Sequence, residues 1–275
     1  MTDDGSFRVM TVDTTETVRA AVAAQRVSGE DARWLGELVT GTVLIRETMS
    51  PDLRVQGILQ GVGGRGGLVA DSHPDGGSRG LVQRASGLAS GAVALGDGAR
   101  LQMMRTLPRG GVQQGIVRVE GETGVSGALM RYLQESEQVE SALAVATIVE
   151  DGEVKAAGGY LVQILPELDE IVLAIMTARL QSFPTMEALL REATHADAVM
   201  ELLLKDLPFT ALSRSPLRFQ CRCDRVRMLQ AMATISRGEI ESMVREGKPL
   251  EIECDYCHAQ YVLEVAELRG LLRTN

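Results

Sequence analysis

The sequence predicts an α+β protein: a mainly antiparallel N-terminal sheet with packed helices, then a helical linker, then a small C-terminal zinc-binding domain. Short stretches of alternating apolar and polar residues, joined by glycine-rich turns, predict the sheet between residues 53 and 120. Helical spacing dominates after Pro166, and none of the four cysteines lies in the first 220 residues. We therefore expect an N-terminal core domain over residues 1–166, a linker over 167–215 and a zinc-binding domain over 216–275.

Composition excludes several classes of protein. The 275 residues are 45% apolar, which is enough for a sizeable core, and the formal net charge is −9. This acidic balance does not favour a nucleic-acid partner. No stretch approaches eighteen uninterrupted apolar residues, and Met1–Asp4 does not start a signal peptide. We expect a cytoplasmic protein with no membrane span.

Two helices are predicted near the N-terminus. The first covers residues 14–25, with Thr14 or Thr15 as its cap. The second begins near Ser28, and apolar residues from Trp34 onward follow helical spacing. It should end before Pro51, because the residue preceding a proline avoids the helical region.

The next segments predict strands over residues 53–60, 68–71, 78–83, 101–106 and 112–120. Turn chemistry separates them at His73–Gly77 and at Pro108–Gly111. The stretch Gly61–Gly66 matches G-x-G-x-x-G in form. A dinucleotide site would need a helix after the glycines, whereas strand pattern follows, so we interpret this stretch as a hairpin.

The second half returns to mixed pattern. A helix is predicted over residues 122–136, strands over 142–149 and 154–165, and nearly continuous helix from 167 to about 206. The last part predicts a strand at 218–220, helices at 224–236 and 239–246, strands at 250–253 and 261–264, and a final helix at 265–272.

The two cysteine pairs carry the chemistry. Cys221-x-Cys223 and Cys254-x-x-Cys257 are separated by the residues from Asp224 to Glu253, so a fold must bring them together. Four thiolates from two close pairs form the tetrahedral, soft-ligand set that zinc prefers. Disulfides are the competing interpretation, but they belong to oxidising compartments. We therefore expect a reduced, metal-loaded resting state.

Other interpretations of the same residues are weaker. Cys254–His258 matches the C-x-x-C-H of haem attachment, which would leave the first cysteine pair without a role. A thioredoxin-like site would need a helix after Cys257, where the pattern is extended. His258 is expected beside the site rather than as a ligand. The histidines form no hydrolase constellation, so we expect no enzyme.

With this cysteine spacing, the chain resembles the bacterial thirty-three-kilodalton heat-shock protein family, the redox-regulated holdase chaperones. C-x-C, then about 30 residues, then C-x-x-C is distinctive, because ordinary zinc ribbons open with C-x-x-C. Residues 114–122, 136–138 and 157–166 agree as well. The resemblance covers most of the chain and is weakest in the first 50 residues and the linker.

The resemblance implies a switch. In the reduced state the four cysteines would hold one zinc ion and the chaperone would be inactive. Oxidation would form the disulfides Cys221–Cys223 and Cys254–Cys257 and release zinc. The zinc-binding domain and linker would then unfold, exposing a surface that binds unfolding client proteins, and the active form would be a homodimer.

The residues give this a physical basis. Structural zinc contributes about 10–16 kcal/mol in small zinc peptides, as much as a small domain's whole stability. The linker is rich in Leu, Ile and Met, which would form an adaptable apolar surface once exposed. Two alternatives remain open: a constitutive interaction protein with purely structural zinc, and a thiol–disulfide oxidoreductase.

Overall fold

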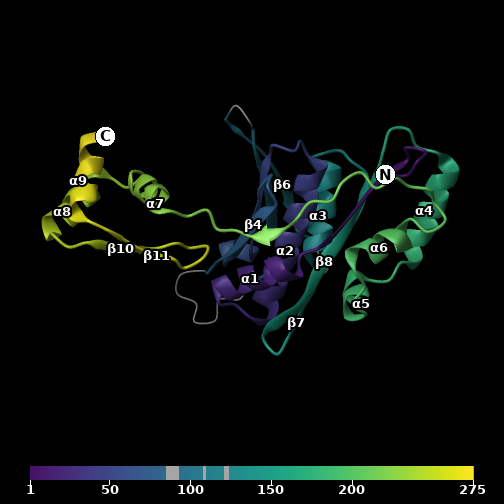
Figure 1. Ribbon diagram of the computed structural model, residues 1–275, viewed down its shortest axis with the longest axis horizontal. Helices are drawn as coiled ribbons and strands as arrows, with labels where there is room; N and C mark the ends of the chain where they lie inside the picture. Colours follow the sequence, from purple (N-terminus) through teal and green to yellow (C-terminus); the bar gives the residue numbers. More distant parts are fainter. Residues whose placement is uncertain (85–92, 108–109, 121–123, 275) are drawn as a thin grey trace. The chain divides into compact units, whose positions relative to one another are not determined.

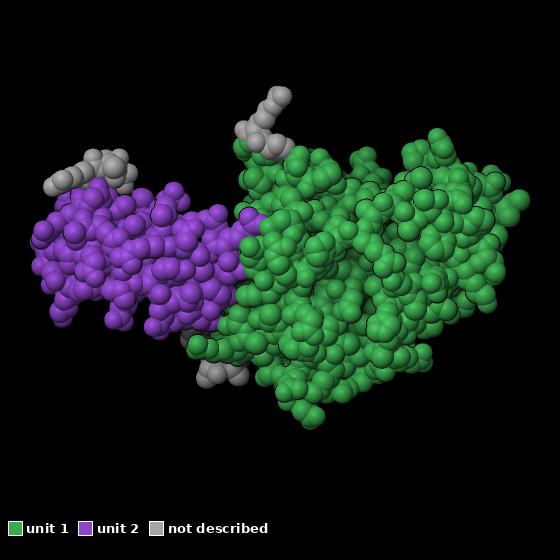
Figure 2. All heavy atoms as spheres, in the orientation of Figure 1, with its two compact units in different colours: residues 1–220 green, residues 221–275 purple. Residues whose placement is uncertain are grey.

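The protein is described by a computed structural model that covers residues 1–84, 93–107, 110–120 and 124–274 (Figure 1). Pro108 and Arg109 of one expected turn, and Glu122 at the expected start of one helix, lie outside these residues. The chain forms two compact units, residues 1–220 and 221–275, coloured green and purple in Figure 2. Helices and mainly antiparallel sheets make up the first unit, which confirms the α+β class.

The larger sheet has six strands in the order β6-β5-β2-β3-β4-β9, and every neighbouring pair is antiparallel except β4 with β9. Its strands are β2 (Arg54–Gln60), β3 (Gly67–Ser72), β4 (Gly77–Gln83), β5 (Arg100–Thr106), β6 (Val112–Arg118) and β9 (Arg218–Phe219). A single 3-10 turn, η1 (Val62–Gly64), connects β2 to β3, which pair with Ile58 opposite Val69. The glycine-rich stretch is therefore a hairpin connection, as its sequence predicts.

Three helices cover one face of this sheet: α1 (Thr15–Gln25), α2 (Gly29–Thr48) and α3 (Gly124–Glu135). Apolar side chains from α2, such as Leu35 and Leu38, are fully buried against the core-facing residues Leu59, Leu68 and Leu101. Burial of this kind stabilises the fold by about 25 cal/mol per Å² of apolar surface removed from water. Both N-terminal helices occur where the sequence predicts them.

A second sheet has three strands in the order β1-β8-β7: β1 (Phe7–Asp13), β7 (Ser141–Glu150) and β8 (Glu153–Ile164). Its alternate residues face different cores. Leu161 of β8 packs with α1 and α2, whereas Tyr160 and Val162 belong to a separate apolar cluster on the opposite face. Strand β1 was not predicted. Its pairing partner, β8, lies about 150 residues further along the chain, with Phe7 opposite Ile164.

The opposite face of this second sheet is covered by the helices that follow Pro166: α4 (Glu170–Ser182), α5 (Met186–Arg191) and α6 (Ala196–Leu203) (Figure 1). Asp169 caps α4 by accepting bonds from the main-chain N–H groups of Ile171 and Val172, and Thr185 caps α5. These helices belong to the first compact unit. The division of the chain at residues 166 and 215 stays a prediction.

The second unit contains α7 (Arg225–Met232), α8 (Arg237–Glu246), the hairpin β10 (Leu250–Glu253) and β11 (Gln260–Leu263), and α9 (Val265–Thr274). Asp224 caps α7, and Ser236 with Glu239 forms a capping box at the start of α8. Its buried apolar core is small: Met232, Ile240, Leu263 and Leu268, with partly buried neighbours around them.

Among the helices of the described residues, none combines the length and apolar character that crossing a bilayer would require.

Candidate metal centre

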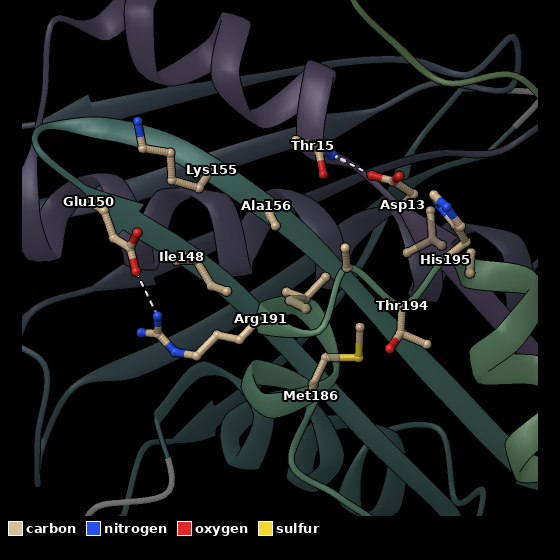
Figure 3. Close-up of a pocket in the computed structure, with 14 residues that line it drawn as sticks. Asp13, Thr15, Ile148, Glu150, Lys155, Ala156, Met186, Arg191, Thr194 and His195 are labelled. Atoms are coloured by element: carbon tan, nitrogen blue, oxygen red, sulfur yellow. Dashed lines mark hydrogen bonds and ion pairs between the residues drawn. The ribbon is translucent and has the colours of Figure 1, made fainter.

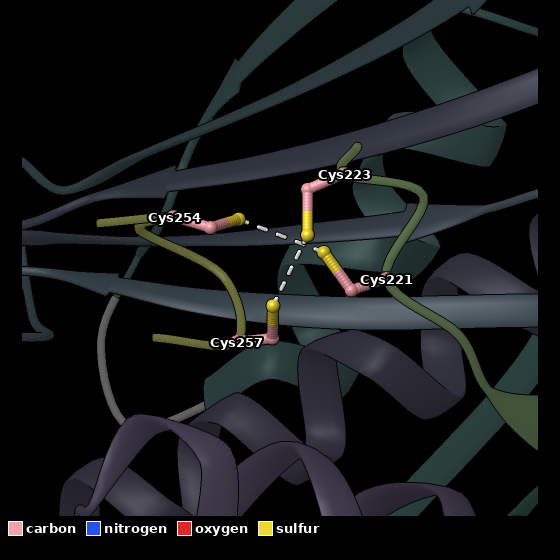
Figure 4. Close-up of side chains that lie close together, drawn as sticks. All are labelled: Cys221, Cys223, Cys254 and Cys257. Atoms are coloured by element: carbon pink, nitrogen blue, oxygen red, sulfur yellow. Dashed lines mark hydrogen bonds between the residues drawn. The ribbon is translucent and has the colours of Figure 1, made fainter. Parts of the chain in front are cut away.

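Four sulfur atoms meet in the second unit (Figure 4). Cys221 and Cys223 follow strand β9, whereas Cys254 and Cys257 lie in the connection between β10 and β11. The Sγ atoms of Cys221 and Cys254 are 3.7 Å apart, and those of Cys223 and Cys257 are 3.3 Å apart. All four Sγ atoms lie within 4.8 Å of one another, and all four thiols are free. The fold therefore assembles the cluster that the spacing predicts.

These separations suit a zinc ion. Zinc–sulfur bonds of about 2.3 Å in a tetrahedron place the sulfur atoms about 3.8 Å apart. Two of the sulfur–sulfur separations, 3.7 and 3.3 Å, are close to that edge length. A disulfide would require about 2.05 Å. The geometry and the donor set fit one four-coordinate metal ion held by thiolates.

Local structure explains why the second cysteine pair turns toward the first. Strands β10 and β11 pair with Glu253 opposite Gln260, which closes the loop that carries both cysteines. Inside this loop the main-chain N–H of Cys254 donates to the carbonyl of Ala259 at 3.0 Å, and that of His258 donates to the carbonyl of Cys254 at 2.8 Å. His258 takes a left-handed conformation with φ of 57°, which completes the tight turn.

The surroundings of the sulfur atoms favour a bound cation. Burial raises the pKa of the Cys254 thiol, and burial likewise raises that of Cys257, so without a cation both groups keep their protons. A coordinating metal reverses this preference, because a coordinated thiol is deprotonated. Tyr261 of β11 donates from its hydroxyl to Cys223 Sγ at 3.1 Å, and this bond raises the pKa of Tyr261 to about 12. The sequence alone did not indicate this hydrogen bond.

His258 is a neighbour of the site, as expected, rather than a member of the cluster. Its Nδ1 contacts a carboxylate oxygen of Glu253. Among the described residues, the only group of potential ligands close enough to share an ion consists of the four cysteines.

A separate pocket of about 420 Å³ lies in the first unit between the second sheet and helices α5 and α6 (Figure 3). Arg191 bonds to Glu150 at 2.6 Å and to Glu187 at 2.9 Å. Asp13 accepts from the main-chain N–H of Thr15. Because these charged groups already pair with protein groups, the cysteine cluster is the stronger candidate for functional chemistry.

The fold and the site define a class of protein: an α+β domain joined to a small unit that carries a four-cysteine cluster able to hold a metal ion. The sequence model of the family described as "Hsp33 protein" matches residues 1–264. The chain therefore belongs to the Hsp33 family, which is a family of chaperones.

Individual relatives agree with this assignment. The 33 kDa chaperonin of Syntrophotalea carbinolica is 31% identical over 98% of this chain and 96% of its own length. That of Streptococcus pyogenes serotype M49 (strain NZ131) is 28% identical, with 98% and 95% of the two chains covered. The crystal structure of the 33 kDa chaperonin from Thermotoga maritima superposes with a TM-score of 0.83 at 26% identity, covering 98% of this chain and 95% of that one.

Proposed function

We propose that this protein is a redox-regulated holdase: Cys221, Cys223, Cys254 and Cys257 bind one zinc ion and keep the chaperone inactive, and oxidation of these cysteines activates it. One observation carries the proposal, namely four free thiols within 4.8 Å of one another in a unit whose described residues, the cysteines apart, bury only four apolar side chains. Below about 70–80 residues a hydrophobic core seldom stabilises a domain by itself. Metal binding therefore supplies most of this unit's stability, and loss of the metal unfolds it.

The proposed chemistry balances. Each peroxide molecule accepts two electrons from one pair of thiolates, a sulfur–sulfur bond forms, and two water molecules leave after taking up two protons. Two peroxides thus convert the four thiolates into the disulfides Cys221–Cys223 and Cys254–Cys257. Disulfide sulfurs no longer bind the metal as thiolates, so the zinc ion is released.

The linker supplies the responsive surface. Helices α4 to α6 bury Met176, Met186, Leu189, Val199 and Leu203 against the second sheet. In α4, only Met176 is fully buried, while Ile171 and Ile175 are exposed. Unfolding of this segment would uncover both the helices' own apolar residues and the sheet residues beneath them, such as Tyr160 and Val162. Such a surface suits unfolding client proteins.

Three further properties belong to the proposal: a homodimer formed through the N-terminal domain, a cytoplasmic location and the absence of catalysis. They are supported by membership in a chaperone family. The acidic net charge of −9 does not favour a nucleic-acid partner.

The experiment measures zinc content, free thiols and client aggregation on one sample, before and after peroxide at mildly raised temperature. We expect one zinc ion and four protected thiols beforehand, then free zinc, no thiols and suppressed aggregation. Zinc that stays bound with unchanged activity would instead establish a structural metal in a constitutive interaction protein. Turnover in an insulin-reduction assay would indicate an oxidoreductase.

The disulfide pairing needs its own test, because separations of 3.7 and 3.3 Å join the first cysteine pair to the second. Trypsin cleaves after Arg222 and so separates Cys221 from Cys223, whereas Cys254 and Cys257 share one peptide. The proposed pairing predicts a linked peptide pair from residues 219–222 and 223–225. A link from either of these peptides to the one containing Cys254 would refute it.

A further inference from the structure

We infer that the outer edge of strand β4 is a docking site for an extended, uncharged segment of an unfolding client, and that strand β9 covers this edge in the reduced protein. The inference deepens the proposed function and rests on it, because it identifies a surface that the switch would uncover. The argument depends on contacts within the first unit and on the covalent link from β9 to the cysteine cluster.

Strand β9 is a minimal strand. It has two residues, Arg218 and Phe219, and it is the parallel neighbour of β4 at the end of an otherwise antiparallel sheet. Its flanking main-chain bonds run from the N–H of Arg218 to the carbonyl of Gly76 at 3.2 Å and from the N–H of Gln220 to the carbonyl of Ser78 at 2.8 Å. Few bonds hold it, so a longer strand can replace it with a gain in main-chain hydrogen bonds.

The β3–β4 turn packs closely against strand β9 and its neighbouring residues. Gly76 has φ of +78°, and a Cβ atom added there would lie 2.0 Å from the carbonyl oxygen of Pro216. A Cβ at Gly77 would lie 2.4 Å from Oε1 of Gln220. Asp75 in the same turn accepts from both terminal nitrogens of Arg218, at 2.7 Å through its carbonyl and 2.8 Å through its carboxylate. The guanidinium of Arg218 is thus the principal side-chain anchor of β9.

Strand β9 is joined to the cysteine cluster through the backbone. Only Gln220 separates β9 from Cys221, so a metal-bound Cys221 restrains the strand. Once Cys221 leaves the metal, β9 loses that restraint and keeps its few bonds to β4, the bonds from Arg218 to Asp75 and its packing against α1. A β-strand edge that loses its neighbour presents unpaired main-chain groups, which readily pair with another extended chain.

The chemistry of the β4 edge indicates what it accepts. Successive residues of β4 direct their main-chain N–H and C=O groups alternately toward β3 and away from it. Gly77 bonds toward β3, so the main-chain groups of Ser78, Gly80 and Val82 point away from β3. The N–H of Val82 is already satisfied by Oε1 of Gln25 at 2.9 Å. Beside this edge, Arg79 and Arg54 share the carboxylate of Asp71. Asp75 loses its bond to Arg218 when β9 leaves. The charges of these two cations and two carboxylates cancel, so the edge offers main-chain bonds beside Ser78 and Gly80 without a net charge that would select a charged client.

Hydrogen exchange resolved to single amides by NMR tests the inference in the full-length protein. The amide of Ser78, which pairs with Phe219, reports on the covered edge. The amide of Val82 is an internal control, because Gln25 protects it in either state. Oxidation is expected to lower protection at Ser78 by roughly 10- to 100-fold. Addition of reduced lactalbumin with its thiols capped by iodoacetamide, a permanently unfolded probe without added charge, is expected to restore it and to protect Gly80, which does not pair with β9.

Three outcomes would overturn the inference while leaving the proposed switch intact. Protection at Ser78 that persists after zinc release would mean that β9 stays in place. Protection that is lost and not restored by the probe would mean that clients bind elsewhere. Protection that returns with rising protein concentration and no client would mean that a second copy of the chain takes the edge.

A variant tests the edge without redox chemistry. Arg218→Pro removes both the main-chain donor to Gly76 and the guanidinium bonded to Asp75. Arg214→Pro is its matched control, because Arg214 forms an exposed ion pair with Asp197 and donates no main-chain bond to any described residue. Reduced, zinc-loaded Arg218→Pro should lose protection at Ser78 and regain it with the probe, whereas the control should match the wild type. Identical behaviour of both variants would refute the docking site, whatever the outcome for the switch.

Discussion

Replacing Leu203 with alanine tests whether the packing of the linker sets the threshold for activation. Leu203 is 0% exposed in the cluster between α6 and the second sheet, whereas the adjacent Leu202 is 43% exposed. The two leucines share one helix and one chemistry, so Leu202→Ala is a matched control. Alanine is also the better helix former, so any loss of stability in either variant comes from packing.

The expected magnitude follows from burial. Leucine-to-alanine changes at fully buried sites cost about 3–5 kcal/mol, whereas the half-exposed Leu202 should cost about 1 kcal/mol. If the linker opens as a local unit, Leu203→Ala raises its opening equilibrium by about 100- to 5,000-fold. The bond from Arg179 to the carbonyl of Leu203 at 2.7 Å uses the main chain and remains in both variants.

The assay combines hydrogen exchange of the α4–α6 amides with client aggregation at increasing peroxide. Reduced Leu203→Ala should exchange faster across α4 to α6, keep one zinc ion, and become active at lower peroxide or temperature than Leu202→Ala. Equal exchange and equal thresholds in the two variants would refute the idea that this packing restrains the switch.

Three other predictions follow from the structure. Cys254→Ser should weaken zinc binding and unfold the C-terminal unit, and a zinc-replete variant with native circular dichroism would contradict this. Burial by itself would raise the pKa of Asp71, but the bonds and charges of Arg54 and Arg79 outweigh burial and lower this pKa. The ionised Asp71 therefore stabilises the fold above about pH 4, and this stabilisation is lost as the pH falls through the pKa of Asp71 in the folded protein. Asp71→Asn should therefore lower the free energy of unfolding by about 3–5 kcal/mol at neutral pH, and its melting temperature should fall less steeply with decreasing pH than that of the wild type. An unchanged pH dependence of the melting temperature would argue against the ion pairs of Asp71 with Arg54 and Arg79. Ala193, after α5, has a φ of 54°, a left-handed conformation that glycine adopts at lower cost. Ala193→Gly should therefore stabilise the linker by about 1 kcal/mol and raise the peroxide concentration needed for activation. A lower peroxide requirement would disprove this.

Much of the fold could be predicted because it depends on local pattern. The hairpins β2–β3 and β7–β8 join neighbours in sequence, and helix α2 ends before Pro51, where backbone sterics require it. Strand β1 was missed because its seven residues gain their stability from β8, far along the chain. Residues Phe7–Asp13 largely alternate apolar and polar side chains, which is typical of a strand. A single short alternating stretch is weak evidence for a strand when its pairing partner cannot be identified from the sequence.

For the site, the sequence by itself determined the four candidate ligands, because no other cysteines exist and soft ligands in two close pairs suit zinc. Only the tertiary structure decided which sulfur atoms lie closest, that Tyr261 donates to Cys223, and that helices α4 to α6 cover the second sheet. Residue types and spacing limit which chemistry is possible. Distances and burial between segments far apart in the chain depend on packing, which is a property of the whole fold rather than of any one segment.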